Sequence, residues 1–108
     1  PKITKSMSEI NWDWSNIKIH NWVRGLNPYP GMYTYFKKRR IRIYKTLPLK
    51  GQTKTPGQVM EFSKNNITIS TGHNLLQILE LQIEGKKRMS FKDFINGIDI
   101  KPGDIFKK

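Results

Sequence analysis

The sequence predicts a small, mainly β domain with about five or six short antiparallel strands. Apolar and polar residues alternate in several short stretches, as they do in strands that bury one face. Gly, Pro and Asn separate these stretches at short intervals, as expected of tight turns. A helical pattern precedes the first strand. Strands of this kind close into a barrel or stack as a small sandwich, and the pattern alone fits both.

The size and composition fit a single domain with one hydrophobic core. The chain has 108 residues, and five Phe, three Trp and four Tyr contribute to that core. There is no Cys, which excludes disulfides, thiolate catalysis and Cys-based zinc sites. No apolar run approaches the roughly 20 residues of a membrane span, and no signal-peptide segment opens the chain. We therefore expect a soluble cytoplasmic protein with no membrane partner.

A helix is expected from about residue 14 to residue 25. Apolar residues recur there at intervals of three and four, in a stripe formed by Trp12, Ile19, Val23 and Leu26. Asp13 can accept hydrogen bonds from the first free amides and is the expected N-cap. Pro28 has no amide hydrogen, so the helix should end before it, and Pro30-Gly31 should form a tight turn.

Six strand segments follow the helix. They are Tyr33–Phe36, Ile41–Lys45, Gln58–Phe62, Ile67–Ser70, Leu76–Ile83 and a short Ile105–Phe106. In the second segment, alternation places Ile41 and Ile43 toward the core and Arg42 outward. The fifth segment changes phase, because its apolar residues occupy even positions up to Ile78 and odd positions from Leu79 onward. A bulge near Ile78, or burial of both faces, would reconcile the two phases.

A short C-terminal helix is expected after Ser90. Asp93 lies three residues later, which is the spacing of a capping box. Gly97 is placed to end this helix in the left-handed conformation at C′.

Positive charge is the strongest feature of the composition. Twenty Lys and Arg oppose eight Asp and Glu, which gives a formal charge of +12. No acidic residue lies between Asp13 and Glu61, although basic residues are frequent there. Binding a polyanion would relieve their mutual repulsion and release condensed counterions. A lysine-rich codon bias is the alternative explanation for the lysines, but it explains the arginines poorly.

Two basic clusters are the candidate nucleic-acid contacts. The first should lie at a solvent-exposed hairpin turn, and the second follows the long strand. The candidate residues are Lys37, Lys38, Arg39, Arg40, Arg42, Lys45, Lys86, Lys87 and Arg88. Long cationic side chains suit phosphate contacts, which position a nucleic acid without reading its bases. The alternative is a solvated run of charge that keeps strand edges from pairing.

Tyrosines are secondary candidates, and the histidines fit structural roles. Exposed Tyr29, Tyr33, Tyr35 and Tyr44 could stack on bases, although aromatic residues in strands more often belong to the core. His20 lies on the expected helix and suits a hydrogen-bonded structural role, whereas His73 lies in an expected turn. The sequence therefore indicates neither a catalytic residue nor a metal site in this segment.

The junction between the expected helix and the first strand has a distinctive sequence. Trp12 is followed by six residues, then by Ile19-His20 and by Arg24-Gly25-Leu26-Asn27-Pro28-Tyr29-Pro30-Gly31-Met32-Tyr33-Thr34. This junction resembles that of the C-terminal domain of the methionyl-tRNA formyltransferase family, with Tyr29 in place of the usual Trp and Met32 in place of the usual Ala. Four further segments follow in family order, namely Thr55–Val59, Leu79–Gln82, Gly85–Ser90 and Asp93–Gly97.

The resemblance implies an oligonucleotide-binding-like antiparallel barrel of about five or six strands, with an N-terminal helix and a short C-terminal helix. It implies that residues 1–11 link two domains and that residues 12–108 form the C-terminal, tRNA-binding domain. The chain begins without Met at what would be a linker, so we expect it to be a piece of a longer enzyme. The family's catalytic Asn, His and Asp belong to an N-terminal domain that this chain does not contain.

By the same resemblance, the whole enzyme would transfer a formyl group from its co-substrate 10-formyltetrahydrofolate to initiator methionyl-tRNA. This segment would bind the tRNA backbone, hold no cofactor or metal itself, and work as a monomer beside its own catalytic domain. One alternative is the C-terminal domain of a related enzyme that acts on a sugar nucleotide or hydrolyses formyltetrahydrofolate, but small substrates do not call for a charge of +12. The other is a free-standing barrel that binds single-stranded nucleic acid.

Overall fold

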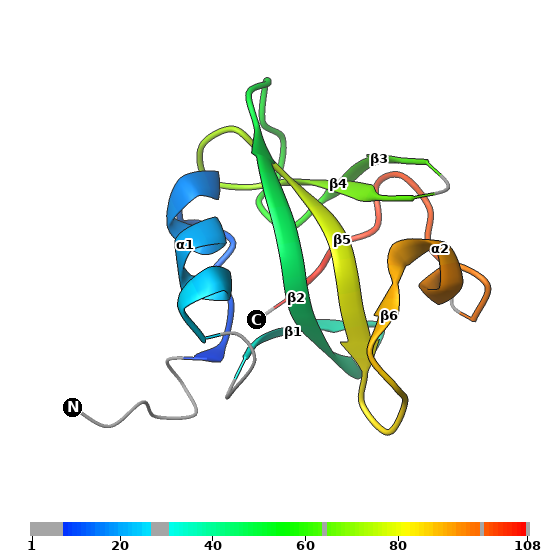
Figure 1. Ribbon diagram of the computed structural model, residues 1–108. Helices are drawn as coiled ribbons and strands as arrows, with labels where there is room; N and C mark the ends of the chain where they lie inside the picture. Colours follow the sequence, from blue (N-terminus) through cyan, green and yellow to red (C-terminus); the bar gives the residue numbers. More distant parts are fainter. Residues whose placement is uncertain (1–7, 27–30, 64, 98, 108) are drawn as a thin grey trace.

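The computed structural model describes residues 8–26, 31–63, 65–97 and 99–107, and it contains a six-stranded antiparallel sheet with two helices (Figure 1). The elements are α1 (Asn16–Leu26), β1 (Met32–Phe36), β2 (Arg39–Leu49), β3 (Val59–Phe62), β4 (Ile67–Ser70), β5 (Leu75–Ile83), β6 (Met89–Ser90) and α2 (Phe91–Phe94). The strand order is β1-β2-β5-β4-β3, and β6 pairs with β5. The predicted mainly β fold with an N-terminal helix and a short C-terminal helix is confirmed.

β2 extends well beyond its predicted end. The prediction stopped before Pro48, because Pro cannot donate a hydrogen bond within a sheet. In the structure β1 pairs only with Arg39 to Ile43, so the second half of β2 is bonded to β5 on one side only. Pro48 lies in that half, opposite Leu76. The predicted alternation in the first half is confirmed, since Ile41 and Ile43 are buried.

The predicted irregularity near Ile78 is present as a bulged region between β2 and β5. Ile43 pairs with Leu81, but Thr46 pairs with Ile78, and the register shifts on both sides of Lys45. Ile78 and Leu81 are both fully buried although they are three residues apart. The shift in register therefore lets β5 bury Leu76 and Ile78 before the irregularity and Leu81 and Ile83 after it.

α1 begins two residues later than predicted, and its N-cap is Ser15 rather than Asp13. The Ser15 hydroxyl accepts a hydrogen bond from the Lys18 amide at 3.2 Å. Asp13 is exposed, and its own amide donates to the Asn11 side chain at 3.0 Å. A separate turn therefore precedes the helix and displaces the cap. α1 ends at Leu26, before Pro28 as predicted. Of the predicted tight turn at Pro30-Gly31, Pro30 lies outside the described residues, whereas Gly31 has a φ of 78°.

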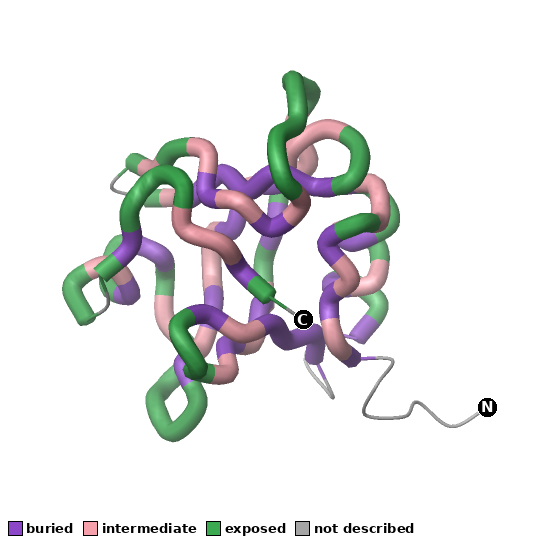
Figure 2. Tube along the Cα trace, turned by 180° about the vertical axis from the view of Figure 1, so that it is seen from behind, coloured by how far each residue is buried: buried purple, intermediate pink, exposed green. Residues whose placement is uncertain are grey.

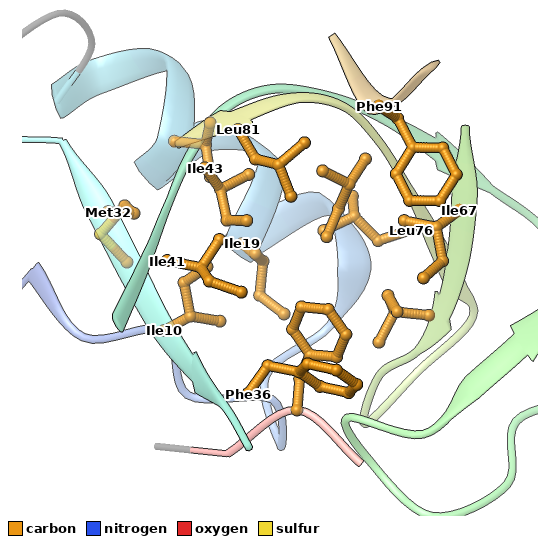
Figure 3. Close-up of a cluster of buried hydrophobic side chains, with 14 of the residues drawn as sticks. Ile10, Ile19, Met32, Phe36, Ile41, Ile43, Ile67, Leu76, Leu81 and Phe91 are labelled. Atoms are coloured by element: carbon orange, nitrogen blue, oxygen red, sulfur yellow. The ribbon is translucent and has the colours of Figure 1, made fainter. Parts of the chain in front are cut away.

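The core lies between the sheet and the two helices. In Figure 3, the side chains of Ile19 from α1, Phe36 from β1 and Leu81 from β5 meet in one apolar cluster. Seen from behind, exposed residues gather in the loops, and buried residues follow the strands and the inner side of α1 (Figure 2). Ile10, which precedes α1, is also fully buried in this cluster.

Three C-terminal predictions are wrong in detail. Ser90 occupies the N-cap of α2, but its hydroxyl lies 3.4 Å from the Asp93 carboxylate and caps no backbone amide. α2 is a single turn with its C-cap at Ile95, so Gly97 lies one residue beyond C′. The predicted last strand is replaced by isolated antiparallel bridges, from Ile105 to Gln58 and from Lys107 to Tyr35.

Candidate nucleic-acid interface

The first basic cluster begins in the tight turn between β1 and β2. Lys37 and Lys38 are its two central residues, with φ of 50° and 67°. Positive φ at both positions is what a type I′ hairpin turn requires. Lys37, Lys38 and Arg39 are exposed, so the predicted hairpin position is confirmed, whereas Arg40 is half-buried in β2.

The second cluster lies beside the first because β2 pairs with β5. Ile41 lies opposite Ile83, and the Glu84 amide donates to the Arg40 carbonyl at 2.9 Å. The loop after β5 carries Lys86 and Lys87, which are both exposed. In Figure 1 the β1–β2 turn and the β5–β6 loop lie at the same end of the sheet. The two clusters, far apart in the sequence, therefore form one cationic end.

Two adjoining hollows lie at this end and share Arg40 and Glu84. The first, of about 210 Å³, is lined by Arg40, Arg42, Gln82, Glu84 and Gly85. The second, of about 260 Å³, is lined by Lys38, Arg39, Arg40, Ile83, Glu84 and Lys86. Each can hold several water molecules or a phosphate group, since one water needs roughly 10–15 Å³. The sequence reasoning missed Gln82, Glu84 and Gly85, because only the strand register brings them to the arginines.

Lys37 is already engaged by acidic groups near the C-terminus. Its Nζ donates to the Asp99 carbonyl at 2.7 Å and lies 3.8 Å from the Asp104 carboxylate. The Asp99 carboxylate is 4.0 Å away. These exposed contacts are weak individually, but together they direct Lys37 away from the two hollows.

Arg88 is likewise held by other residues of the domain. Its Nη2 and Nε lie 2.8 Å and 3.0 Å from the Glu80 carboxylate. Its guanidinium also lies over the Tyr44 ring, 4.5 Å from the centroid. Arg88 therefore has a structural explanation as a link between the β5–β6 loop and the sheet.

Arg40 and Arg42 share the outer face of the sheet with two tyrosines. Tyr33 lies opposite Arg42 and Tyr35 opposite Arg40, so all four side chains are on one face. The Arg40 guanidinium lies 4.1 Å from the centroid of the Tyr33 ring. Tyr33 is only 1% exposed, so this predicted stacking candidate is not accessible to a base.

The other predicted contacts, Lys45 and the remaining tyrosines, do not line either hollow within the described residues. Lys45 is exposed within the bulged region and lines neither hollow. Tyr35 and Tyr44 are half-buried, and Tyr29 lies outside the described residues. Burial, and then a hydrogen bond to Glu9, raise the pKa of Tyr33.

His20 has a hydrogen-bond partner within the fold, whereas His73 is exposed. His20 Nδ1 lies 2.7 Å from Thr46 Oγ1, which joins α1 to β2. Burial, and then the charge of Arg24, lower the pKa of His20. Among the described residues, no three His, Asp or Glu side chains gather as metal ligands would. Within the same residues, neither helix has the length and apolar character needed to cross a bilayer.

Comparison with known proteins identifies the family. The description "Formyl transferase, C-terminal domain" belongs to a family whose pattern matches residues 2–99. The chain belongs to this family. This match confirms the family membership that we inferred from the helix–strand junction.

Curated relatives extend well beyond the matched region. Methionyl-tRNA formyltransferase of Streptococcus uberis is 40% identical over 108 residues, covering 98% of this chain but 34% of the relative. The enzyme of that name from Carboxydothermus hydrogenoformans is 41% identical, covering 99% of this chain and 35% of the relative. This chain therefore spans about a third of the length of the curated relatives that it matches.

Solved structures support the fold alone. HypX from Aquifex aeolicus superposes with a TM-score of 0.71 at 16% identity, covering 94% of this chain and 19% of HypX. The HypX structure in complex with tetrahydrofolic acid also gives a TM-score of 0.71, at 15% identity, and covers 100% of this chain and 22% of HypX.

Proposed function

We propose that this chain is the C-terminal, tRNA-binding domain of a methionyl-tRNA formyltransferase. The parent enzyme transfers a formyl group from 10-formyltetrahydrofolate to the methionyl group of initiator tRNA, in the cytoplasm. Support comes from curated relatives of that name at about 40% identity, which match this chain over nearly its whole length. The folate co-substrate and the catalytic residues then belong to a separate N-terminal domain, which residues 1–11 connect to this one.

The observation that carries the proposal is the cationic end formed by the two basic clusters. Lys38, Arg39 and Lys86 are exposed there, and within the described residues none of them forms an ion pair. Unpaired cations on neighbouring elements are suited to a row of phosphates. Double-helical RNA is recognised mainly by shape and backbone, so a basic surface serves a folded tRNA better than exposed tyrosines do.

The domain contributes to catalysis by positioning. Holding the acceptor arm by its phosphates places the aminoacyl end at the catalytic centre of the neighbouring domain. This lowers the entropic part of the activation barrier and leaves the chemistry to the residues of that domain. The domain itself supplies neither a cofactor nor a nucleophile in this scheme, and it functions as a monomer.

We further propose that the sheet closes into an oligonucleotide-binding-like barrel through the C-terminal segment. The Lys107 amide donates to the Tyr35 carbonyl at 2.7 Å, on the outer edge of β1. Nearby, the Val59 amide of β3 donates to the Asp104 carbonyl at 2.7 Å. The segment thus bonds to both edge strands, and closure of this kind leaves few strand edges exposed.

Binding of the 108-residue chain to initiator tRNA across a salt series tests the proposal. If about six phosphate contacts form, the logarithm of the binding constant should fall with the logarithm of salt with a slope of about −4 to −5. Preference for a single-stranded oligonucleotide over tRNA would favour the free-standing binder. Absence of RNA binding, with affinity for a sugar nucleotide instead, would favour the alternative formyltransferase.

A second test uses the parent enzyme. Reversing the charges of Lys37 to Arg40 should raise the KM for tRNA strongly and leave the affinity for the folate unchanged. An unchanged KM for tRNA would remove the role assigned to this cluster.

A further inference from the structure

The two hollows at the cationic end are more specific than a diffuse basic surface. We propose that they bind two neighbouring phosphates of one RNA strand, with Arg40 between them contacting both. This proposal rests on the proposed function for one point only, namely that the two phosphates belong to an RNA strand. The same contacts would bind any nucleotide bisphosphate.

The backbone fixes the relation between the hollows. Arg42 in the first hollow lies two residues from Arg40 on the same strand face, and Lys86 in the second follows Glu84 in the adjoining loop. The bond from the Glu84 amide to the Arg40 carbonyl, together with the Ile41–Ile83 pair, holds the two elements together. Residues that line both hollows therefore sit on paired strands rather than on independent loops.

The arginines that line these hollows differ in ion pairing from other basic residues at this end. Arg40 and Arg42 form no ion pair within the described residues, whereas Lys37 and Arg88 do. Arg is suited to this task, since its planar guanidinium offers five N–H donors and can contact more than one phosphate oxygen. Each hollow has at least one further cation, Arg42 in the first and Lys86 in the second.

Arg40 also carries an unmet donor. Its Nε is buried and finds no hydrogen-bond acceptor among the described residues, while the guanidinium lies against the Tyr33 ring. A buried donor of a charged group without an acceptor is costly, and its presence in a native structure calls for an explanation. Turning the guanidinium edge toward a phosphate in either hollow would supply the missing acceptor.

Glu84 is the one acidic residue among the described residues that line the hollows. Its carboxylate is exposed and forms no ion pair in the described part of the chain. A carboxylate between two anion sites weakens the binding of a single phosphate. Because Glu84 lines both hollows, it repels each phosphate alike. The expected preference for a bisphosphate therefore comes from the further cation in each hollow and from Arg40, which the two hollows share.

The test compares cytidine 3′,5′-bisphosphate, cytidine 5′-monophosphate and inorganic phosphate as ligands of the 108-residue chain, by calorimetry or by NMR. We expect the bisphosphate to bind about tenfold more tightly than the monophosphate. Arg40→Lys keeps the charge but removes the shared guanidinium, and it should abolish this preference. Lys50→Ala, just beyond the far end of β2, is the control variant and should keep this preference. Glu84→Gln should tighten the binding of all three ligands.

Equal binding of the bisphosphate and the monophosphate would overturn the proposal, as would an Arg40→Lys variant that behaves like Lys50→Ala. Initiator tRNA separates this failure from that of the proposed function. If tRNA binds the Arg40→Lys and Lys50→Ala variants equally, the paired subsite is wrong although the RNA-binding role stands. If the bisphosphate preference is present but tRNA does not bind, the hollows are correct and the proposed function fails.

Discussion

The two ends of β2 differ in whether their polar side chains have partners within the domain. Where its second half packs against α1, the buried Asn16 side chain donates to the Leu49 and Leu75 carbonyls at 3.0 Å and 2.8 Å. His20 and Thr46 form a hydrogen bond at the same contact. At the hairpin end, Arg40 and Arg42 have no acidic partner among the described residues. The first end satisfies its polar groups internally and serves stability, whereas the second leaves cations unpaired and suits an external anion.

The largest effect should come from the α1 end. Asn16→Ala removes a buried side chain that donates to the Leu49 and Leu75 carbonyls, and it should lower the free energy of unfolding by about 2–4 kcal/mol. Asn21→Ala, an exposed position on the same helix, should change it by less than about 0.5 kcal/mol. Urea denaturation of both variants measures the difference. A cost for Asn16→Ala as small as that for Asn21→Ala would contradict the structural role of this end.

At the hairpin end the expected loss is in binding rather than in stability. Lys38→Glu combined with Arg39→Glu should weaken tRNA binding about 100-fold at ~0.1 M salt and change the free energy of unfolding by less than about 0.5 kcal/mol. Lys50→Glu combined with Lys54→Glu makes the same change in net charge beyond the far end of β2. Equal losses of affinity in the two double variants would mean that only net charge matters.

A third prediction compares Arg42, which has no ion-pair partner in the described residues, with Arg88, which pairs with Glu80. Arg88→Gln with Glu80→Gln keeps the net charge and should leave tRNA affinity within about twofold, with less than about 1 kcal/mol lost in stability. Arg42→Gln with Glu61→Gln also keeps the net charge but should weaken tRNA binding about fivefold. The reverse order of the two affinities would show that Arg88, despite its partner, is the residue that contacts RNA.

The smallest expected effect is the pH dependence of the folding stability that His20, at the α1 end, contributes. The pKa of His20 is lowered in the folded state, so the unfolded chain binds more protons once the pH falls below about 6.5. Stability should therefore be complete above that pH and decline below it, because protonation favours the unfolded chain. Thermal unfolding between about pH 8 and pH 5 should show a weaker decline in His20→Gln than in the His73→Gln control. Identical profiles would mean that His20 does not contribute.

Much of the fold could be predicted because its signals are local. Alternation located the central strands, and the phase change around Ile78 indicated either a bulge or burial of both faces, of which the strand register shows the bulge. The caps were harder, because Asp13, Ser15 and Ser90 are all good N-cap residues by type. A preceding turn closed by Asn11 decided between the first two, and the sequence alone does not rank such competing hydrogen bonds.

The site was only half predictable for a related reason. The two basic clusters are visible as runs in the sequence, but their contacts depend on strand register. Lys37 meets Asp99, 62 residues away, and Arg88 meets Glu80 across a hairpin. Neither pairing has a local signal, so the sequence could not separate the engaged cations from those with no partner in the described residues.

The turn joining β1 and β2 could be made more stable by substitution, but only with a loss of positive charge. Both of its central residues are lysines in a left-handed conformation, where Asn-Gly would relieve roughly 1–2 kcal/mol of steric cost for each residue replaced. Lys37→Asn with Lys38→Gly should therefore raise the melting temperature while depriving the hairpin of charge. Selection for thermal stability alone would therefore favour a more stable hairpin that, under the proposed function, binds its RNA less tightly.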